Sequence, residues 1–307
     1  MAWPHTRAGN AVWSQLGALL ETMRPKQWAK NLIIFVGLIF SDDRLLFHLP
    51  SLGRTTIAFF LFCLLSSSVY ILNDLTDIEK DRKHPIKRHR PLPSGRLAPR
   101  VAQLALVAML TIALTGSMLL GATFGIVALS YLLINIAYSF CLKNIVIVDV
   151  FTIAAGFVLR AVAGAVVIGV AISPWLYVVT ILLALFLAIG KRRHELLLLE
   201  EGRGTHRRVL EEYTAPLLDD MLSVVMASTV IAYSLYTFTA NNLPDNHAMM
   251  LTVPVALYGL FRYLYLIHRR NAGGAPEEVL FQDRPLLAAI VVWGIMVVSI
   301  LYLLPAP

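Results

Sequence analysis

Long apolar runs are the feature that most limits what this chain of 307 residues can fold into. A membrane-spanning helix needs about 20 predominantly apolar residues, and runs near that length recur along the whole sequence. Because the runs do not alternate as barrel strands do, they predict α-helices, which satisfy their own backbone hydrogen bonds in lipid. We therefore expect an all-α, polytopic membrane protein with nine transmembrane helices, at approximately residues 28–41, 55–73, 101–121, 122–142, 145–169, 173–190, 217–240, 248–268 and 285–304.

The overall composition supports the same class of protein. Hydrophobic residues make up 58% of the chain and charged residues 15%, whereas a soluble domain averages about a quarter charged. The two cysteines, Cys63 and Cys141, lie in or at the end of apolar runs without ligand spacing, so we expect neither a disulfide nor a zinc site. The membrane is the expected surrounding, and no nucleic-acid partner is expected.

The basic residues indicate how the helices are oriented. Nine spans with a cytoplasmic N-terminus place all but three of the 26 Lys and Arg residues on one side, as the positive-inside rule requires of cytoplasmic loops. We expect one domain over residues 1–307, in which residues 1–27 form a cytoplasmic amphipathic lead-in without a cleavable signal peptide. Residues 74–100 and 191–216 are then the two large cytoplasmic loops.

A group of acidic residues ends the second apolar run. On a helix, Asp74, Asp77 and Asp81 have the spacing i, i+3, i+7 and form one stripe, with Asn73 beside it. Three like charges on one stripe repel one another, and a divalent cation removes that cost. Mg²⁺ prefers oxygen ligands, commonly one or two carboxylates completed by substrate phosphates. The stripe therefore predicts a metal–diphosphate site at the membrane surface, with Asp74 and Asp77 as the preferred ligands and Asp81 as a third ligand or an electrostatic stabiliser.

Basic residues follow the acidic stripe directly, in the stretch "RKHPIKRHR" at 82–90. Lys83, Lys87 and Arg88 suit further phosphate oxygens, and Arg90 fits either that role or a surface anchor. The alternative interpretation is a solvated charge run that only fixes the orientation of the helix end. The acidic stripe fits that alternative poorly, because ionisable groups that all face one way at a membrane edge are usually functional.

The stretch "NDLTDIEKD" at 73–81 resembles the N-D-x-x-D-x-x-x-D motif of the UbiA-type intramembrane prenyltransferase superfamily. That resemblance implies nine helices around a cavity open to lipid. Four further stretches resemble its decaprenyl-phosphate phosphoribosyltransferase branch: "RPKQWAKN" at 24–31, "DRKHPIKRHRPLPSG" at 81–95, "YSFCLK" at 138–143 and "LAIGKRRHEL" at 187–196.

The sequence departs from the wider superfamily after the sixth apolar run. Aromatic prenyltransferases of the superfamily usually carry a second acidic motif there, for a second metal. This chain instead has Lys191, Arg192 and Arg193, followed by the single acid Glu195. Such a basic site suits an anionic acceptor such as a lipid monophosphate better than it suits a second metal.

The branch resemblance implies a Mg²⁺-dependent transfer of 5-phosphoribose from phosphoribosyl diphosphate to a polyprenyl phosphate in a bacterial plasma membrane. It leaves the length of the prenyl chain, the number of metal ions and the oligomeric state open, although an oligomer is compatible with it. No Ser-His-Asp or Cys-His arrangement is evident, and the reaction needs none because the attacking phosphate is already ionised. Nothing in the sequence matches the Thr-Gly-Gly-Thr-type donor loop of soluble phosphoribosyltransferases, so the donor rests on the resemblance.

Several other residues are expected to bind the substrates. Arg160 lies well inside an apolar run, where a cation is costly, and needs a substrate phosphate or an acidic residue of another helix as its partner. Asp149 is too far along the same helix to pair with it, about 16 Å. The full predicted set is Lys26, Asn31, Asn73, Lys83, Lys87, Arg88, Tyr138, Lys143, Arg160, Lys191, Arg192 and Glu195.

Two other functions compete with this interpretation. An aromatic or quinone prenyltransferase with a prenyl diphosphate donor fits the acidic motif alone but not the basic second site. A transporter or a lipid-binding protein without chemistry fits the helix count, but transporters usually carry polar groups or broken helices near the membrane midplane. Here Arg160 is nearly alone at that depth.

Overall fold

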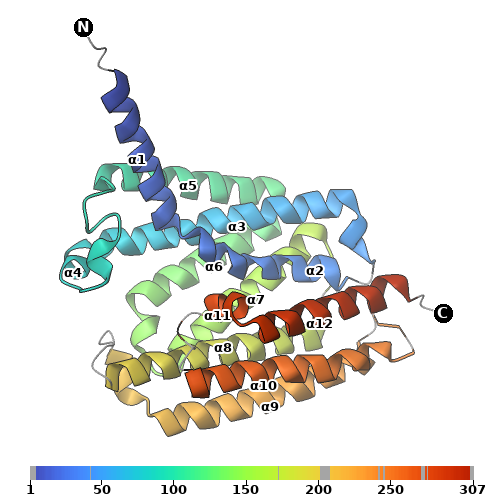
Figure 1. The fold of residues 1–307 in the computed structure, drawn as a ribbon. Coiled ribbons are helices and arrows are strands. Elements are labelled where there is room, and N and C mark those ends of the chain that lie inside the picture. Colours follow the sequence, from blue (N-terminus) through green and yellow to red (C-terminus); the bar gives the residue numbers. More distant parts are fainter. Residues whose placement is uncertain are drawn as a thin grey trace. The chain divides into compact units, whose positions relative to one another are not determined.

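The computed structural model describes residues 5–41, 43–171, 173–200, 208–240, 243–244, 246–270, 274 and 276–304. All of the regular structure in these ranges is helical (Figure 1). The chain forms two compact units, one of residues 1–32 and 56–136 and the other of residues 33–55 and 137–307. The expectation of a single domain over residues 1–307 stays a prediction.

The first unit contains the N-terminal helices and the acidic stripe. Its elements are α1 (His5–Met23), the start of the 3-10 helix η1 (Pro25–Phe35), most of α3 (Leu49–Thr76), α4 (Ile78–Arg82), η3 (Lys87–His89), α5 (Pro99–Leu120) and most of α6 (Ala122–Phe140).

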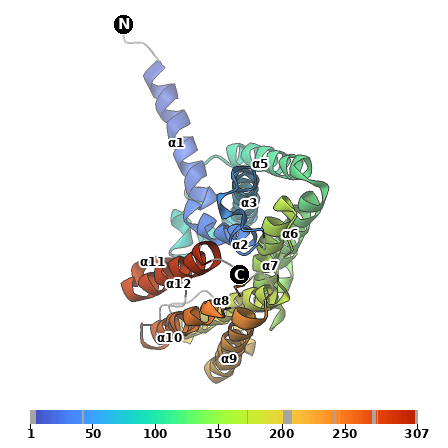
Figure 2. The same cartoon turned by 90° about the vertical axis from the view of Figure 1, so that its right-hand side faces the viewer.

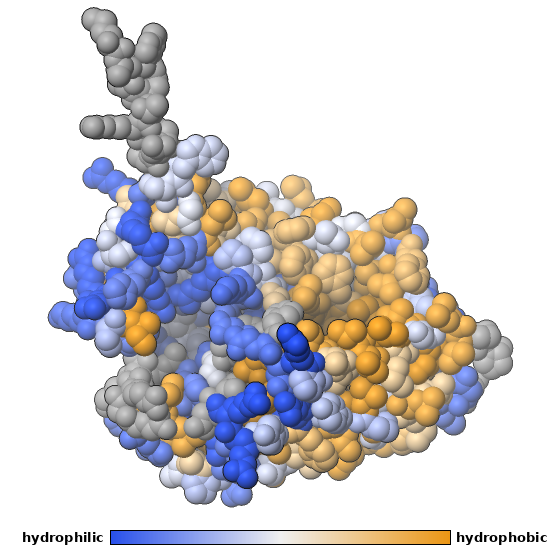
Figure 3. Space-filling view, in the orientation of Figure 1, coloured by the Kyte–Doolittle hydropathy of each residue, from blue (hydrophilic) through white to orange (hydrophobic). Residues whose placement is uncertain are grey.

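A small apolar core fixes the loop between α4 and α5 in this unit. Ala18 of α1, Ile71 of α3 and Ala102 of α5 are buried together with Leu92 and Leu97 from the loop itself. Figure 3 shows hydrophilic residues gathered at the α4 end of the unit and hydrophobic residues along α3 and α5. The two buried leucines explain why a loop so rich in charge has a defined conformation.

The second unit contains the remaining helices. Its elements are α2 (Val36–Ile39), η2 (Leu45–Phe47), η4 (Leu142–Asn144), α7 (Val148–Ile168), α8 (Pro174–Glu200), η5 (Arg208–Glu212), α9 (Ala215–Thr239), η6 (Ala248–Thr252), α10 (Val253–Arg270), α11 (Pro276–Gln282) and α12 (Arg284–Leu303). Helix α8 packs between α7 and α9, and α10 packs on both α9 and α12 (Figures 1 and 2).

Helix starts in this unit follow local sequence signals. Thr214 caps α9 by accepting a hydrogen bond from the Leu217 amide, and Asp283 caps α12 by accepting one from Leu286. A proline occupies the first turn of both helices, where a missing amide hydrogen costs nothing.

Eight helices of the described residues are long and apolar enough to cross a membrane, and they match eight of the nine predicted spans. The predicted span at 28–41 differs, because it is the 3-10 helix η1 followed by the single turn α2. Within the second unit, Gly164 of α7 approaches this segment so closely that an added Cβ would stand 1.8 Å from the Ile34 carbonyl oxygen. Irregular backbone is tolerated at membrane depth where protein covers it, and Ile34, Gly37 and Leu38 are buried.

Candidate functional site: two ionic clusters and an apolar cavity

The predicted acidic stripe lies where α3 passes into α4 in the first unit. The amide of Asp77 donates to the carbonyl of Asn73 at 3.0 Å, and the amide of Asp81 donates to the carbonyl of Asp77 at 2.8 Å. Helical bonding therefore continues across the junction, and the stripe keeps nearly the predicted spacing. Asp74 and Asp81 are each only 2% exposed, whereas Asp77 and Asn73 are half-buried.

Two arginines neutralise the buried carboxylates. Arg90 Nη1 donates to Asp74 Oδ1 at 3.1 Å and to Asp81 Oδ2 at 2.7 Å, so one nitrogen joins both carboxylates. Arg24 Nη2 donates to the same Asp74 oxygen at 2.6 Å, and its guanidinium lies 4.7 Å from the centre of the Tyr70 ring. No local pattern in the sequence pairs Arg24 with Asp74, because 50 residues separate them.

The donor set of this cluster fits one class of metal. No group of three His, Cys, Asp or Glu side chains placed to hold an ion is found among the described residues, so no all-protein cage is present there. Asp74 and Asp81 nevertheless lie within reach of a single nitrogen. Two carboxylates without a further protein ligand suit Mg²⁺, which usually completes its octahedron with water and substrate phosphates.

The basic residues after α4 lie on the outside of the first unit. Lys83 and Arg88 are exposed and Lys87 is half-buried, as contact with a soluble phosphate substrate requires. Lys26 is also exposed. Asn31, one of the predicted substrate-binding residues, is fully buried, and its amide nitrogen lies 3.3 Å from Cys63 Sγ and 3.4 Å from Ser66 Oγ, so it ties η1 to α3.

Arg192 is the centre of a second cluster, in the second unit. Its side chain is 1% exposed, and Nε donates to Asp149 Oδ2 at 2.5 Å. Nη1 donates to Glu195, and Nη2 donates to the hydroxyl of Tyr138 at 2.8 Å. The last residues of α6, which belong to the second unit from residue 137 onward, therefore meet α7 and α8 at one guanidinium. Its partners differ from the predicted lipid phosphate, because two carboxylates already neutralise it.

Asp149 and Tyr213 complete this cluster. The hydroxyl of Tyr213 donates to Asp149 Oδ1 at 2.8 Å and accepts from the Ile147 amide at 2.8 Å. Burial, and next the hydrogen bond to the Asp149 carboxylate, raise the pKa of Tyr213 above its usual range, so the hydroxyl stays protonated at neutral pH. Ile147 has φ +68°, which is strained for a β-branched residue and places its amide toward Tyr213.

The predicted site residues include neither Tyr213 nor Asp149 as the partner of Arg192. An acid at the start of an apolar run was a usable signal for Asp149, since a buried acid needs a cation. Nothing local marks Tyr213, because it follows a polar stretch without periodicity.

The other cations predicted for the acceptor have different surroundings. Arg193 Nε donates to Asp219 Oδ1 of α9 at 2.5 Å, and His268 of α10 contacts the same oxygen at 3.2 Å. Lys143 and Lys191 are half-buried. Of the three consecutive basic residues of α8, Arg192 and Arg193 are thus held by carboxylates of the second unit.

Arg160 is 7% exposed in the middle of α7. Its Nη1 donates to the carbonyl of Gly156 in the same helix at 2.8 Å, and its guanidinium lies 5.4 Å from the centre of the Phe157 ring. Asp149 of the same helix bonds Arg192 instead, in agreement with the expectation that it does not pair with Arg160. A phosphate partner for Arg160 stays a prediction.

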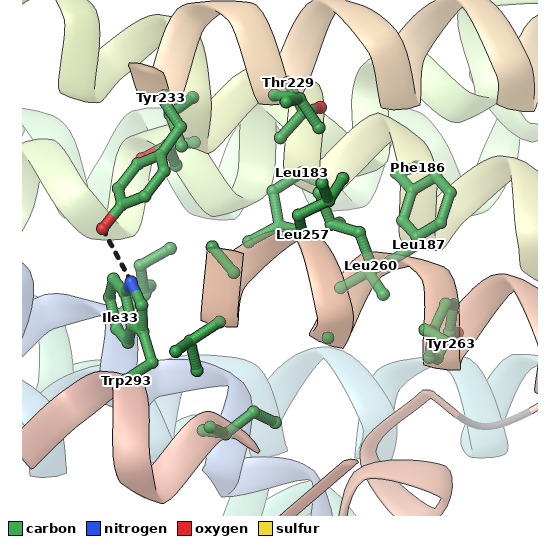
Figure 4. Close-up of a pocket in the computed structure, with 18 of the residues that line it drawn as sticks. Ile33, Leu183, Phe186, Leu187, Thr229, Tyr233, Leu257, Leu260, Tyr263 and Trp293 are labelled. Carbon is green, nitrogen blue, oxygen red and sulfur yellow. Dashed lines mark hydrogen bonds between the residues drawn. The ribbon is translucent and has the colours of Figure 1, made fainter. Parts of the chain in front are cut away.

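An apolar cavity of about 390 Å³ opens in the second unit. Figure 4 shows part of its lining, which comes from the segment around Ile33 and from α7, α8, α9, α10, α11 and α12. Tyr233 is one of its few polar residues, and its hydroxyl is already hydrogen-bonded to Trp293 Nε1 at 2.7 Å and to Thr252 at 2.6 Å. Apart from Thr180 and Thr229, the remaining wall is aliphatic and aromatic, which suits a hydrocarbon ligand.

These observations define a polytopic helical membrane protein with an arginine-neutralised acidic cluster, a buried arginine hub and an apolar cavity. Residues 31–282 match the UbiA prenyltransferase family, and the chain belongs to that family. This confirms the superfamily that the acidic motif resembles.

Curated relatives and solved structures agree with the family. The chain is 33% identical to the decaprenyl-phosphate phosphoribosyltransferase of Mycolicibacterium smegmatis, over 91% of this chain and 90% of that protein. It is 30% identical to the protein of the same name from Corynebacterium glutamicum, over 94% and 87% of the two chains. A UbiA homolog from Archaeoglobus fulgidus, solved with GPP and Mg²⁺, has a TM-score of 0.70 at 20% identity and covers 92% of this chain and 99% of its own, so it shares the fold.

Proposed function

We propose that this protein transfers the 5-phosphoribosyl group from phosphoribosyl diphosphate to a polyprenyl phosphate and releases diphosphate, with Mg²⁺ as cofactor. The observation that carries the proposal is the 33% identity, over nine tenths of both chains, to a relative named decaprenyl-phosphate phosphoribosyltransferase. The basic residues in place of a second acidic motif support it independently, because they favour a phosphate acceptor.

In the proposed reaction a phosphate oxygen of the lipid forms a bond to C1 of the ribose while the bond from C1 to the diphosphate oxygen breaks. No proton has to move, because the acceptor phosphate is already ionised. The protein must therefore position the two substrates and stabilise the charge that develops at C1 and on the leaving group. Bound Mg²⁺ would neutralise charge on the departing diphosphate.

We assign the donor to the first unit. Asp74 and Asp81 are the proposed direct metal ligands, and the half-buried Asp77 is proposed to reach the metal through a bound water, with Asn73 as a neutral ligand or donor beside them. Buried carboxylates are also suited to stabilising a positive ribosyl C1. The exposed Lys83 and Arg88, the half-buried Lys87 and the exposed Lys26 are proposed to bind the phosphate groups of the donor.

We assign the lipid to the second unit. Tyr138 accepts a hydrogen bond from Arg192, so its own hydroxyl hydrogen points to another acceptor, for which a phosphate oxygen is suited. Glu195 and Asp149 hold Arg192, and Lys143 and Lys191 supply half-buried positive charge. The apolar cavity of about 390 Å³ suits part of the isoprenoid chain.

The proposal is tested with the purified full-length protein in lipid nanodiscs. Phosphoribosyl diphosphate labelled in the ribose, Mg²⁺ and decaprenyl phosphate are incubated together, and the label is measured in the organic phase. A parallel reaction with geranyl diphosphate and 4-hydroxybenzoate tests the aromatic prenyltransferase alternative. Label in the lipid in the first reaction supports the proposal, whereas product only in the second refutes it and favours the alternative.

Variants of α8 then test the assignment of the acceptor. Lys191→Ala is expected to raise KM for decaprenyl phosphate more than KM for phosphoribosyl diphosphate. Arg193→Ala is the matched control, because Asp219 and not a substrate holds Arg193. Equal KM values for Lys191→Ala and wild type would leave Lys191 as an orientation signal only.

A further inference from the structure

We propose that Arg90 is a built-in counter-ion that competes with a divalent cation for Asp74 and Asp81, so that the metal binds well only together with a diphosphate. This inference rests on the proposed metal–diphosphate site and adds to it how that site discriminates the complexed metal from the free ion.

Arg90 and a bridging metal ion would use the same carboxylate oxygens. Arg90 Nη1 lies 2.7 Å from Asp81 Oδ2 and 3.1 Å from Asp74 Oδ1, and Arg24 Nη2 lies 2.6 Å from that same Asp74 oxygen. A Mg²⁺ ion that bridges the two carboxylates needs their oxygens within about 2.1 Å. The Arg90 guanidinium already contacts the oxygens of Asp74 and Asp81 that face each other. A metal and Arg90 cannot both bridge the pair through these oxygens.

The charges of the cluster also disfavour a bare divalent cation. Asp74, Asp77 and Asp81 carry three negative charges and Arg24 and Arg90 carry two positive ones, so a bare divalent cation would leave the cluster with a net positive charge. A metal–diphosphate complex instead arrives with net negative charge, which the displaced arginines can bind. Arginine pairs strongly with phosphate oxygens through its planar set of donors.

Only the side chain of Arg90 has to move to release the two carboxylates. Leu92 and Leu97 are buried beside Arg90, and the Leu97 amide donates to the Pro91 carbonyl at 3.0 Å. Arg96 Nη2 donates to the His89 carbonyl at 2.8 Å. The backbone on both sides of Arg90 is thus fixed, while its side chain is 32% exposed and has an outward route. Rotation of the side chain can exchange the carboxylates for a phosphate without moving the loop.

Arg96 itself is fixed to α1, which makes the loop part of a larger assembly in the first unit. Its guanidinium donates to both carboxylate oxygens of Glu21, at 2.7 and 2.9 Å. Gln15 of the same helix accepts from the Ala98 amide at 2.9 Å. These contacts hold the backbone that carries Arg90 against α1.

The experiment measures metal binding without turnover. Mn²⁺, a spectroscopically visible substitute for Mg²⁺, is titrated into the purified full-length protein in nanodiscs and followed by electron paramagnetic resonance, with and without inorganic pyrophosphate. Arg90→Ala is expected to lower Kd for Mn²⁺ alone by about tenfold, because one competing positive charge is gone. With pyrophosphate present, that advantage is expected to vanish or reverse.

Two further variants make the outcome specific. Arg100→Ala removes an exposed arginine of the same unit and is expected to bind Mn²⁺ as wild type does. Arg90→Gln removes the charge but keeps a polar side chain, and it takes the place of Arg90→Ala if that variant misfolds. Unchanged or weaker Mn²⁺ binding in the folded Arg90 variants would overturn the inference and make Arg90 a fixed positioning residue.

The outcomes also separate this inference from the proposed function. Asp81→Asn should abolish Mn²⁺ binding in both backgrounds. If neither wild type nor the Arg90 variants bind Mn²⁺ with pyrophosphate, the metal site itself is wrong and both proposals lose their basis there. If Arg90→Ala binds Mn²⁺ tighter but no label reaches the lipid in the transfer assay, the counter-ion role stands and the proposed substrates are wrong.

Discussion

Replacing Asp149 with Asn tests how much the buried arginine hub of the second unit depends on its carboxylates. The side chains of Asp149 and Arg192 are 0% and 1% exposed, so neither charge is solvated. The amide of Asn has nearly the same shape and can still accept from Tyr213, so the substitution keeps the packing but removes the charge and the acceptor that faces Arg192 Nε.

The size of the effect follows from the burial. Removing one partner of a buried ion pair typically costs about 3–5 kcal/mol, because the remaining charge is left uncompensated. Glu195 also bonds Arg192 and is 21% exposed, so part of the compensation survives. We therefore expect the lower end, about 3 kcal/mol, which lowers the ratio of folded to unfolded protein roughly 150-fold.

The assay is equilibrium unfolding of the full-length protein in mixed micelles, followed by far-UV circular dichroism. Asp219→Asn is the matched control, because Asp219 pairs with Arg193 but is 36% exposed, and such a pair contributes no more than about 1 kcal/mol. The double variant Asp149→Asn/Arg192→Met should regain stability, since no unpaired cation remains buried.

One result would refute this reasoning. If Asp149→Asn costs no more than Asp219→Asn, the buried pair does not hold α7 to α8, and water or another group must solvate Arg192. Activity gives a second readout, because Arg192 also bonds Tyr138: the proposed transfer should fall in Asp149→Asn even at temperatures where the variant is fully folded.

Three more outcomes are expected. Asp77→Asn should lower the rate of the proposed transfer about 100-fold or more and leave the thermal midpoint unchanged, and activity within tenfold of wild type would remove Asp77 from the mechanism. EDTA should stop the wild-type reaction, and turnover in EDTA would remove the metal from the mechanism. Gly164→Ala should lower the free energy of unfolding by about 3 kcal/mol or more, because the added Cβ would meet a backbone carbonyl oxygen at 1.8 Å. Gly259→Ala is the control and should cost no stability, because its Cβ would meet nothing within 4 Å. Equal thermal unfolding midpoints for the two variants would contradict the close approach at Gly164. The hydrogen bond from Arg262 lowers the pKa of Asp283. The stability difference between wild type and Asp283→Asn should therefore be fully present above about pH 4 and disappear as pH falls through that lowered pKa. A stability difference that stays constant down to about pH 2 would contradict this.

The sequence by itself determined the class of the molecule and most of its helices. Eight spans were predictable because hydropathy over about 20 residues is a local property, and lipid leaves a chain of that kind few other structures. The family was predictable from a local motif as well, since "NDLTDIEKD" lies within two turns of one helix end.

The tertiary structure alone decided how the charges are paired. Arg192 meets Asp149 across 43 residues, Tyr213 meets Asp149 across 64, and Arg24 meets Asp74 across 50. No pattern along the chain distinguishes these partners from its other arginines and acids. Only packing brings the pairs together, and only burial makes their neutralisation necessary.

The same holds for the first predicted span. Residues 28–41 are apolar enough to predict a membrane helix, yet they form a 3-10 helix and one α-helical turn. The close approach of Gly164 to the Ile34 carbonyl belongs to a helix more than 100 residues further along the chain. A local pattern reports which backbone conformations a segment favours, whereas a distant backbone that packs against it decides which of them it adopts.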